Sequence, residues 1–233
     1  MTSSTSGRGI VFLLDVDNTL LDNDRIVAEL KEELTVAVGA ARQQRYWTIF
    51  EAVRTELGYA DYLGTLQRYR LEDPHEPGLL AISSFLLNYP FADRLFSGAL
   101  DVIDRLNGVG RTVIMTDGDV VFQPLKIERS GLARAVGGRI LLYVHKEREL
   151  DDVERRYPAD HYVLVDDKVR ILTAVKTAWD GRVTTIFPRQ GHYANAEEIA
   201  KYPPPDVAID QISDLLHLDL ARIGSAAGPG HEH

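Results

Sequence analysis

The sequence predicts an α/β fold, in which a Rossmann-like parallel sheet core carries helices on both faces and an α-helical cap domain is attached to it. Three observations lead to this fold class. Short apolar runs alternate with helical patterns over most of the chain, as in parallel sheets with helical crossovers. Several runs are apolar throughout, as expected of strands buried on both faces. The alternation is interrupted by one long stretch that contains only helical patterns.

The strands are predicted from the short apolar runs. The first, Ile10–Leu14, lies between Gly9 and Asp15. The other candidates follow in order at 112–115, 139–144, 162–165, 183–187 and, more weakly, Val207–Ile209. Strands that alternate with helices form parallel sheets with right-handed crossovers. The carboxyl ends of these strands should therefore meet at one edge of the sheet.

Helical patterns lie between the later strands. They cover Ala99–Asn107, 121–130, 150–157, Val169–Trp179 and 212–223. Glycine marks their ends or the turns that follow them, at positions 108, 131, 138 and 181.

Residues 22–96 are predicted to form the helical cap. Ile26, Leu30, Leu34 and Val38 recur every four residues, which predicts one apolar helix face. Further helices are predicted from apolar spacing near 49–57, 62–69 and 79–87. Residues 1–21 and 97–233 would then form the α/β catalytic core, with the cap over the strand ends.

The composition limits the kinds of molecule and the kinds of chemistry that we expect of this chain. The 233 residues are 45% hydrophobic, which is enough for one sizeable core with a small appended domain. The net charge of −9 disfavours nucleic acid and anionic membrane surfaces, so we expect neither as a partner. No apolar stretch is long enough to span a bilayer. The absence of cysteine excludes disulfides, thiol catalysis and thiolate-bound metals.

The two ends are expected to be flexible tails. Residues 1–9 are rich in Ser, Thr and Gly and lack the apolar run of a signal peptide. Residues 225–233 contain His231 and His233, which could suggest a metal tract, but a tail is the stronger interpretation. Together with the lack of cysteine, this favours a cytoplasmic location.

Polar side chains follow four predicted strands at the point where each strand ends. They are Asp15 and Asp17 after the first strand, Thr116 after the second, Lys146 after the third, and Asp166 and Asp167 after the fourth. Function collects at this edge of such sheets, so the side chains should share one site. Taken singly, each could instead cap a helix or carry a solvated charge. Their common position favours the catalytic interpretation.

The residue types suit phosphoryl transfer. Asp15 is placed to attack phosphorus, and Asp17 to protonate the leaving oxygen and then deprotonate water. Asp15 and Asp167 offer the hard oxygen ligands that Mg²⁺ prefers, and the backbone carbonyl of Asp17 can also face the metal. Thr116 and Lys146 would hold the non-bridging phosphate oxygens.

This order of residues resembles the four motifs of the haloacid dehalogenase (HAD) superfamily. The first is Asp15-x-Asp17-x-Thr19, and the resemblance covers essentially the whole chain. Thr116 precedes Lys146 by 30 residues, and Lys146 precedes Asp167 by 21, so each gap can hold one helix and one strand. The long gap before Thr116 is similar to that of members with a helical cap after the first motif.

The resemblance implies a magnesium-dependent phosphoric monoester hydrolase that forms a phosphoaspartate on Asp15. Either acid of the fourth motif could bind the metal directly, and the resemblance favours Asp167 as the direct ligand, with Asp166 acting through water. His145 is the alternative residue for the third motif, and Lys146 is preferred because it stays charged.

Three further positions are predicted to bind the substrate phosphate. These are the backbone N–H group of Asn18 and those of the turn formed by Asp117 and Gly118, which precedes a helix. Asp117 departs from the resemblance, because asparagine is common after the threonine of the second motif.

Some side chains have two open interpretations. Aromatic cap residues could face substrate or pack between helices: Tyr46, Trp47 and Phe50. Cap arginines could bind a second anionic group or remain solvated: Arg45, Arg54 and Arg68. The polar loop 190–193 could close over the site or lie on the surface.

Other functions are also open. A 2-haloacid dehalogenase needs neither an acid at Asp17 nor a metal. A phosphomutase would return the phosphoryl group to a second hydroxyl. A phosphonate hydrolase would need a cap lysine, for which Lys31 is the candidate. A non-catalytic protein that binds a phosphorylated ligand belongs to a different class. We expect a small phosphorylated metabolite as the substrate, and the sequence does not predict the oligomeric state.

Overall fold

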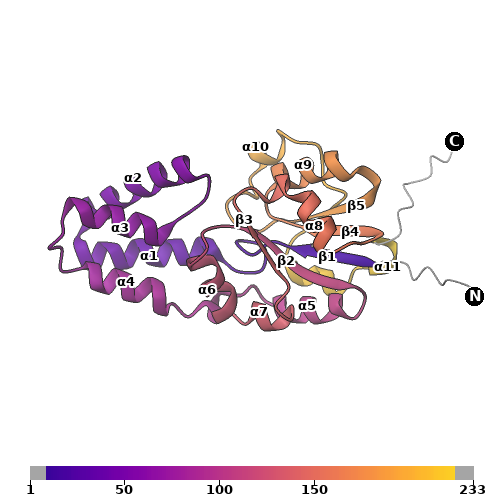
Figure 1. The fold of residues 1–233 in the computed structure, drawn as a ribbon, viewed down its shortest axis with the longest axis horizontal. Helices are drawn as coiled ribbons and strands as arrows, with labels where there is room; N and C mark the ends of the chain where they lie inside the picture. The colour runs from indigo at the N-terminus through magenta and orange to yellow at the C-terminus, as the bar shows by residue number, and fades with distance from the viewer. Residues whose placement is uncertain (1–8, 224–233) are drawn as a thin grey trace, which may run out of the picture.

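The structure is a computed structural model that describes residues 9–223, so the expected tails, with His231 and His233, lie outside the described residues. Its centre is a six-stranded sheet in the order β3-β2-β1-β4-β5-β6 (Figure 1). The strands are β1 (Ile10–Leu14), β2 (Arg111–Asp117), β3 (Ile140–Tyr143), β4 (His161–Val165), β5 (Val183–Pro188) and β6 (Val207–Ile209). Each neighbouring pair is parallel, which confirms the predicted sheet. This is the doubly wound strand order, with β1 near the centre.

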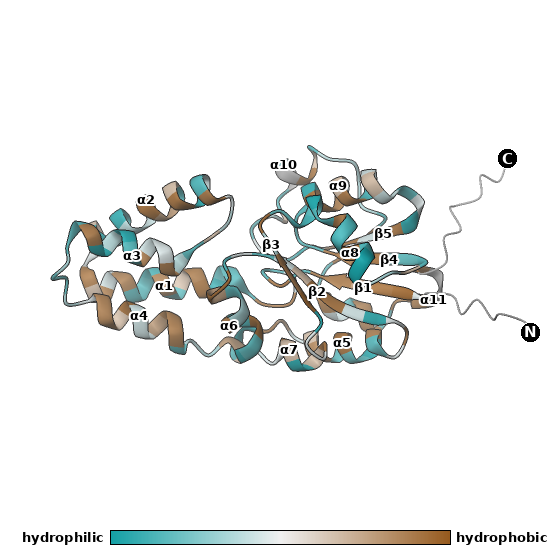
Figure 2. Cartoon of the chain, viewed as in Figure 1, coloured by the Kyte–Doolittle hydropathy of each residue, from teal (hydrophilic) through white to brown (hydrophobic). Residues whose placement is uncertain are grey.

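Helices cover both faces because the central strand is apolar on both sides. Phe12 and Leu14 of β1 face one core, and Val11 and Leu13 face the other. The first core contains residues of α5 (Ala99–Asn107), α6 (Phe122–Arg129) and α7 (Leu132–Ala135). The second contains residues of α8 (Leu150–Arg156) and α9 (Val169–Trp179). The strands are accordingly apolar along much of their length (Figure 2).

Four helices lie together beside the sheet, at the left of Figure 1. They are α1 (Asn23–Val38), α2 (Ala40–Leu57), α3 (Tyr62–Glu72) and α4 (Leu79–Asn88). The four-residue spacing in α1 buries Ile26, Leu30 and Leu34, as its periodicity predicts. The helix α2 ends at Gly58, whose φ of 83° is a left-handed conformation that favours glycine. Among the described residues, no helix combines the length and the apolar character needed to cross a membrane.

Two neighbouring segments connect these helices to the sheet. Leu21 and Leu95 form an antiparallel bridge, next to the short 3-10 helix η1 (Phe91–Arg94). The backbone N–H of Asp22 donates to the carbonyl of Arg94 at 2.8 Å. This pairing holds the start of α1 beside the segment that leads from α4 to α5.

The predicted helix at 212–223 is wrong. The segment forms the 3-10 helix η4 (Ile212–Leu216) and the separate short helix α11 (Leu220–Ile223). Arg105 donates to the carbonyls of Leu216 and, at 2.7 Å, of Leu218. These bonds take carbonyl groups that a continuous helix would use internally, so the helix breaks there. The short elements α7, α10 (Ala196–Ile199), η2 (Lys146–Arg148) and η3 (Asp180–Arg182) have no counterpart in the sequence prediction.

Candidate active site

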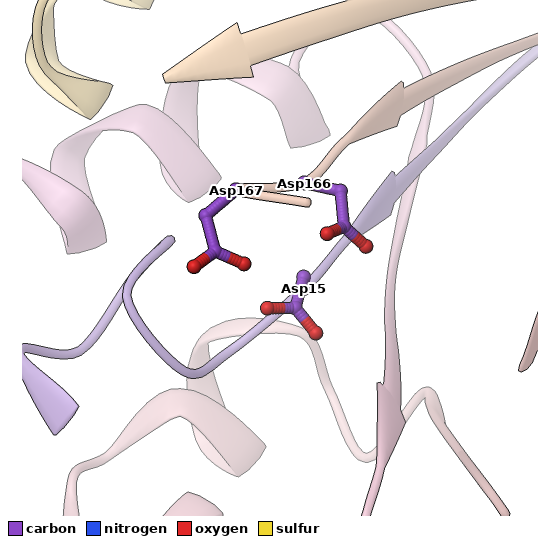
Figure 3. A group of neighbouring side chains, drawn as sticks. All are labelled: Asp15, Asp166 and Asp167. Atoms are coloured by element: carbon purple, nitrogen blue, oxygen red, sulfur yellow. The ribbon is translucent and has the colours of Figure 1, made fainter. Parts of the chain in front are cut away.

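Three carboxyl groups meet at the ends of β1 and β4. The two strands are neighbours, and the backbone N–H of Asp15 donates to the carbonyl of Val165 at 3.0 Å. Asp15, Asp166 and Asp167 turn toward one another (Figure 3) and offer oxygen atoms that lie within 4.8 Å of one another. All three are buried. Carboxyl groups this close and this buried are stable together only when nearby cations or bound protons offset the repulsion between their charges.

Lys146 supplies one such cation. It is fully buried, and its ammonium group donates to Asp15 Oδ1 and to the carbonyl of Met115. The same nitrogen lies 2.7 Å from Asp166 Oδ2. Burial lowers the pKa of Lys146, but the carboxylates of Asp15 and Asp166 outweigh burial and raise it overall. Lys146, and not its neighbour His145, therefore reaches the carboxylates, and it stays charged.

Asp166 and Asp167 have different surroundings. Asp166 pairs with Lys146, and its Oδ1 accepts the backbone N–H of Lys168 at 2.8 Å. Both carboxyl oxygens of Asp167 are buried and have no hydrogen-bond partner within residues 9–223. Burial, and then the charges of Asp15 and Asp166, raise the pKa of Asp167 well above its ordinary value. A buried carboxyl group without donors fits a divalent cation, for which Asp15 offers a second hard ligand.

Thr19 connects the nucleophile candidate to the acidic pair. Its hydroxyl donates to Asp15 Oδ2 at 3.3 Å and accepts the backbone N–H of Asp167 at 3.1 Å. The side chain is completely buried. The two oxygens of Asp15 therefore have separate partners, Lys146 and Thr19, which hold the plane of the carboxylate.

Thr116 and Asp117 lie at the end of β2. The buried hydroxyl of Thr116 accepts a hydrogen bond from Gln123 Nε2 at 3.0 Å. Asp117 Oδ1 accepts the backbone N–H of Lys146 at 2.7 Å. Burial raises the pKa of Asp117 to about 6, although the charge of Lys146 acts in the opposite direction. The additional carboxylate therefore holds the backbone of Lys146.

Two of the three backbone N–H groups predicted to bind phosphate donate to carbonyl groups of the chain. That of Asn18 donates to the carbonyl of Leu21 at 2.7 Å, and that of Gly118 to the carbonyl of Tyr143 at 3.1 Å. Asn18 has a φ of 59°, which shapes the tight turn after Asp17. Both N–H groups thus stabilise backbone turns.

Asp17 is held by a lysine that the sequence analysis did not single out. Lys126 of α6 is only 1% exposed, and its Nζ lies 2.7 Å from Asp17 Oδ1. The same ammonium donates to Asn23 Oδ1 at 3.1 Å. One signal could have found it, since Lys126 follows Phe122 by four residues and so lies on the buried face of the helix.

A cavity of about 710 Å³ lies between the strand ends that carry Asp17 and Asp167 and the helices of the expected cap. Asp17, Asp167 and Lys168 line one end of it. The opposite wall includes cap residues, namely Val27, Lys31, Trp47, Phe50, Arg54 and Tyr62. Residues of the expected core and of the expected cap therefore line one common cavity, which is large enough for a small metabolite.

The structure separates the cap residues whose interpretation the sequence left open. Trp47, Phe50 and Arg54 line the cavity, whereas Tyr46 is buried and its hydroxyl donates to the carbonyl of Tyr62 at 3.0 Å. Arg45 pairs with Glu72, and Arg68 with Glu56, on the exposed surface. Lys31 lies in the cavity wall, with Nζ 5.1 Å from the ring centroid of Trp47.

The polar loop 190–193 lies over the turn after β1. The backbone N–H of His192 donates to Asp24 Oδ2 at 2.7 Å, and His192 Nδ1 lies 2.6 Å from Asp24 Oδ1. Gly191 has a φ of 68°, and a Cβ placed there would lie 2.6 Å from the side chain of Asn18. His192 and Tyr193 line the cavity, so this loop forms one of its edges.

A second lysine missed by sequence reasoning lies under this loop. Lys168 Nζ is 5.5 Å from the ring centroid of Tyr193. Burial lowers the pKa of Lys168, but the carboxylates of Asp15 and Asp167 raise it overall. The acidic cluster is therefore flanked by two cations, Lys146 and Lys168.

Comparison with known proteins gives two findings about the family. Residues 11–151 match the family model of haloacid dehalogenase-like hydrolases. The chain is also similar to the crystal structure of a candidate haloacid dehalogenase-like hydrolase from Burkholderia xenovorans LB400. The two share 58% sequence identity over 91% of this chain and 99% of the other, with a TM-score of 0.86. No curated protein matches the chain.

More distant structures share the fold. The HAD-hydrolase YfnB from Bacillus subtilis, in a magnesium-bound crystal form, is 19% identical, with 90% of this chain and 98% of that chain covered and a TM-score of 0.58. An L-2-haloacid dehalogenase from Xanthobacter autotrophicus, with chloropropionic acid covalently bound, is 16% identical, with 91% and 98% covered and a TM-score of 0.56. At this level of identity the likeness extends to the fold alone.

Proposed function

The chain belongs to the haloacid dehalogenase-like hydrolases, and from that membership we propose that it is a magnesium-dependent phosphatase that acts through a phosphoaspartate on Asp15. One observation carries the proposal: the two carboxylates of the first motif have separate surroundings. Asp15 is buried between Lys146 and Thr19, whereas the side chain of Asp17 is 29% exposed and lines the cavity. A nucleophile and a separate acid-base group need this division of roles.

In the first step, an oxygen of Asp15 attacks the substrate phosphorus and forms the Asp15–phosphorus bond. The bond between phosphorus and the ester oxygen breaks, and Asp17 in its protonated form gives its proton to that oxygen. Lys146 and Thr19 hold the attacking carboxylate, which lowers the entropy cost of reaching the reactive geometry.

In the second step, the ionised carboxylate of Asp17 takes a proton from water as the water oxygen attacks phosphorus. The bond between phosphorus and Asp15 breaks, which releases inorganic phosphate and the free carboxylate. Asp17 then carries the proton needed for the next turnover, as the reversal of acid and base roles requires.

The carboxylates of Asp15 and Asp167 would hold Mg²⁺, together with the backbone carbonyl of Asp17, and Asp166 would act through water. The orphaned oxygens of Asp167 support this ligand set. A bound Mg²⁺ ion supplies positive charge that offsets the repulsion between an anionic nucleophile and an anionic substrate.

Thr116 and Lys146 would bind the transferred phosphoryl group, and Lys168 adds positive charge beside them. Asn18, Asp117 and Gly118 remain part of the proposed phosphate site. The N–H groups of Asn18 and Gly118 would reach substrate only after their turns shift, because each now donates to a carbonyl. The size of the cavity supports a small phosphorylated metabolite as substrate, and we keep the cytoplasm as the proposed location.

The test compares two substrates that separate phosphatase from dehalogenase chemistry. Purified protein is assayed with p-nitrophenyl phosphate and with L-2-chloropropionate, each in Mg²⁺ and in EDTA. We expect phosphate release that requires Mg²⁺, and no chloride release. Asp15→Asn should lower kcat/KM for the phosphate ester by at least about 1,000-fold, because the nucleophile is lost. Chloride release without metal would replace the phosphatase proposal by dehalogenation, and a folded protein inert toward both substrates would favour a binding role.

A further inference from the structure

Lys126 is a buried cation with few partners. Its side chain is 1% exposed in α6, and its ammonium group lies 2.7 Å from Asp17 Oδ1 and 3.1 Å from Asn23 Oδ1. The nitrogen also lies 5.6 Å from the ring centroid of Phe122. Burying a lysine is costly unless the ammonium group is paired and hydrogen-bonded, so the position of Lys126 depends strongly on these neighbours.

The two carboxylates of the first motif have different cations. Lys146 pairs with Asp15, and Lys126 is the cation that pairs with Asp17 within the described residues. Lys126 comes from α6, which follows the second motif, whereas Asn23 is the first residue of α1. One ammonium group therefore fixes Asp17 against both the sheet domain and the first helix of the expected cap.

We propose that Lys126 is a positioning residue, whose ammonium group holds the carboxyl group of Asp17 toward the ester oxygen of a bound phosphate ester. This inference rests on the proposed function, since it assigns a support to the acid-base group of that reaction. Lys126 does not touch the reacting atoms. It acts through the orientation of Asp17, and Asn23 fixes the lysine in turn.

The leaving group of the substrate gives a measurable signature of this role. p-Nitrophenolate departs readily without a proton, whereas phenolate departs far less readily and gains more from general acid catalysis. A misplaced Asp17 should therefore slow hydrolysis of phenyl phosphate much more than that of p-nitrophenyl phosphate. A general loss of folded protein would lower both rates by the same factor.

The test measures kcat/KM for both esters with Mg²⁺ in the wild type, Lys126→Met, Lys126→Arg and Asp17→Asn. We expect Lys126→Met to lower the value for phenyl phosphate at least about tenfold more than that for p-nitrophenyl phosphate. Lys126→Arg keeps the charge but moves its donors, so it should fall between the wild type and Lys126→Met. Asp17→Asn should show the largest selective loss.

Lys176→Met is the matched control. It removes a lysine from α9 whose Nζ lies 3.0 Å from Asp206 Oδ2, outside the cavity. It should leave the ratio of the two kcat/KM values unchanged. If Lys126→Met does not fold, a ratio in Lys126→Arg equal to that of the wild type overturns the inference.

The two proposals fail in different ways. A wild-type protein that hydrolyses neither ester overturns the proposed function and this inference with it. A selective loss in Asp17→Asn without one in Lys126→Met overturns the role of Lys126 alone. Equal losses for both esters in Lys126→Met lead to the same conclusion, because they indicate a structural role only.

Discussion

At the scale of single residues, the chemical state of each acid in the site depends on which cation contacts it. Lys146 contacts both Asp15 and Asp166, whereas Asp167 has no hydrogen-bond donor within the described part of the chain. A cation in contact with a buried carboxylate offsets the cost of burying its charge, and a buried carboxyl group without a cation or hydrogen-bond donor is stable only when it binds a proton or a metal. Asp166 and Asp167, which are adjacent in the sequence, therefore have different chemical surroundings.

Asp117 allows the cost of burying a carboxylate charge to be measured. Its pKa is raised from an ordinary 3.8 to about 6, so the folded protein holds a proton that the unfolded chain releases in that range. Folding is therefore penalised as the pH rises from about 4 to 6, and the penalty is complete above 6. Asp117→Asn removes the penalty and keeps an oxygen that can accept the N–H of Lys146. We expect about 1–2 kcal/mol of added stability at pH 8 and none near pH 4.

Urea unfolding of both proteins in EDTA at the two pH values measures this difference. A gain of equal size at pH 4 and pH 8 would show that the carboxylate charge is not its cause.

At the scale of elements, one loop and one helix connect distant parts of the chain. The loop 190–193 contacts Asn18 and Asp24 through Gly191 and His192, and so joins the segment after β5 to the turn after β1. Glu29 of α1 accepts hydrogen bonds from Tyr89 and Arg94, which lie in the segment after α4. Neither link follows from the local sequence of the element itself.

Gly191→Ala should displace the loop. A Cβ at this position would lie 2.6 Å from Asn18, and the φ of 68° is unfavourable for alanine. We expect kcat/KM for p-nitrophenyl phosphate to fall about tenfold or more, because the turn that carries Asp17 shifts with Asn18.

Gly138→Ala is the control for the backbone effect. Gly138 has a φ of 74°, but a Cβ there would meet nothing within 4 Å. Gly138→Ala should lose about 1 kcal/mol of stability and Gly191→Ala at least as much, and only Gly191→Ala should lose activity. Equal activities in the two variants would rule out a role for the loop in shaping the site.

Glu29 makes the stability of the expected cap depend on pH. Burial raises its pKa, but hydrogen bonds from Tyr89, Arg25 and Arg94 outweigh burial and lower it to about 2. This contribution to stability is complete above the ordinary value of 4.5 and is lost as the pH falls toward 2. We expect Glu29→Gln to lower the free energy of unfolding by about 1–2 kcal/mol at pH 7, and by much less near pH 2.5.

Denaturant unfolding followed by circular dichroism across this pH range tests the expectation. Glu56→Gln breaks only an exposed pair with Arg68, so it should change stability little at any pH. An effect of Glu29→Gln that persists undiminished at low pH would contradict the assigned cause.

At the scale of the whole molecule, the acidic cluster lies between the sheet and the cavity that reaches the first two helices of the expected cap. The cluster joins β1 to β4 at the centre of the sheet, and the cavity continues from it to α1 and α2. A cation bound by Asp15 and Asp167 would relieve a repulsion that the folded chain alone contains. Ligands that bind the folded state selectively stabilise the entire fold.

Millimolar Mg²⁺ should therefore raise the Tm of the protein by roughly 2–6 °C relative to EDTA. Asp167→Asn should abolish most of this increase, because it removes the carboxylate with free oxygens. In EDTA no cation offsets the buried carboxylate of Asp167 in the wild type, so the variant without this carboxylate should have the higher Tm there. Calorimetry measures both effects, and an undiminished Mg²⁺ response in Asp167→Asn would exclude it as a ligand.

The sequence by itself determined the fold class and the order of the candidate catalytic residues. The apolar runs and the helical spacing are local patterns, and a strand that is buried on both faces is apolar at nearly every position. The positions of Asp15, Thr116, Lys146 and Asp167 followed because each lies at a predicted strand end. The carboxyl ends of parallel strands meet at one edge of the sheet, whichever side chains pack around them.

Only the tertiary structure decided which groups touch. Lys126 meets Asp17 across 109 positions of sequence, and Asp117 turns to the backbone of Lys146 across 29. The helix predicted over 212–223 breaks because Arg105 takes two of its carbonyls. These outcomes depend on side chains from distant segments competing for the same hydrogen-bonding groups, and no local pattern of apolar and polar residues encodes that competition.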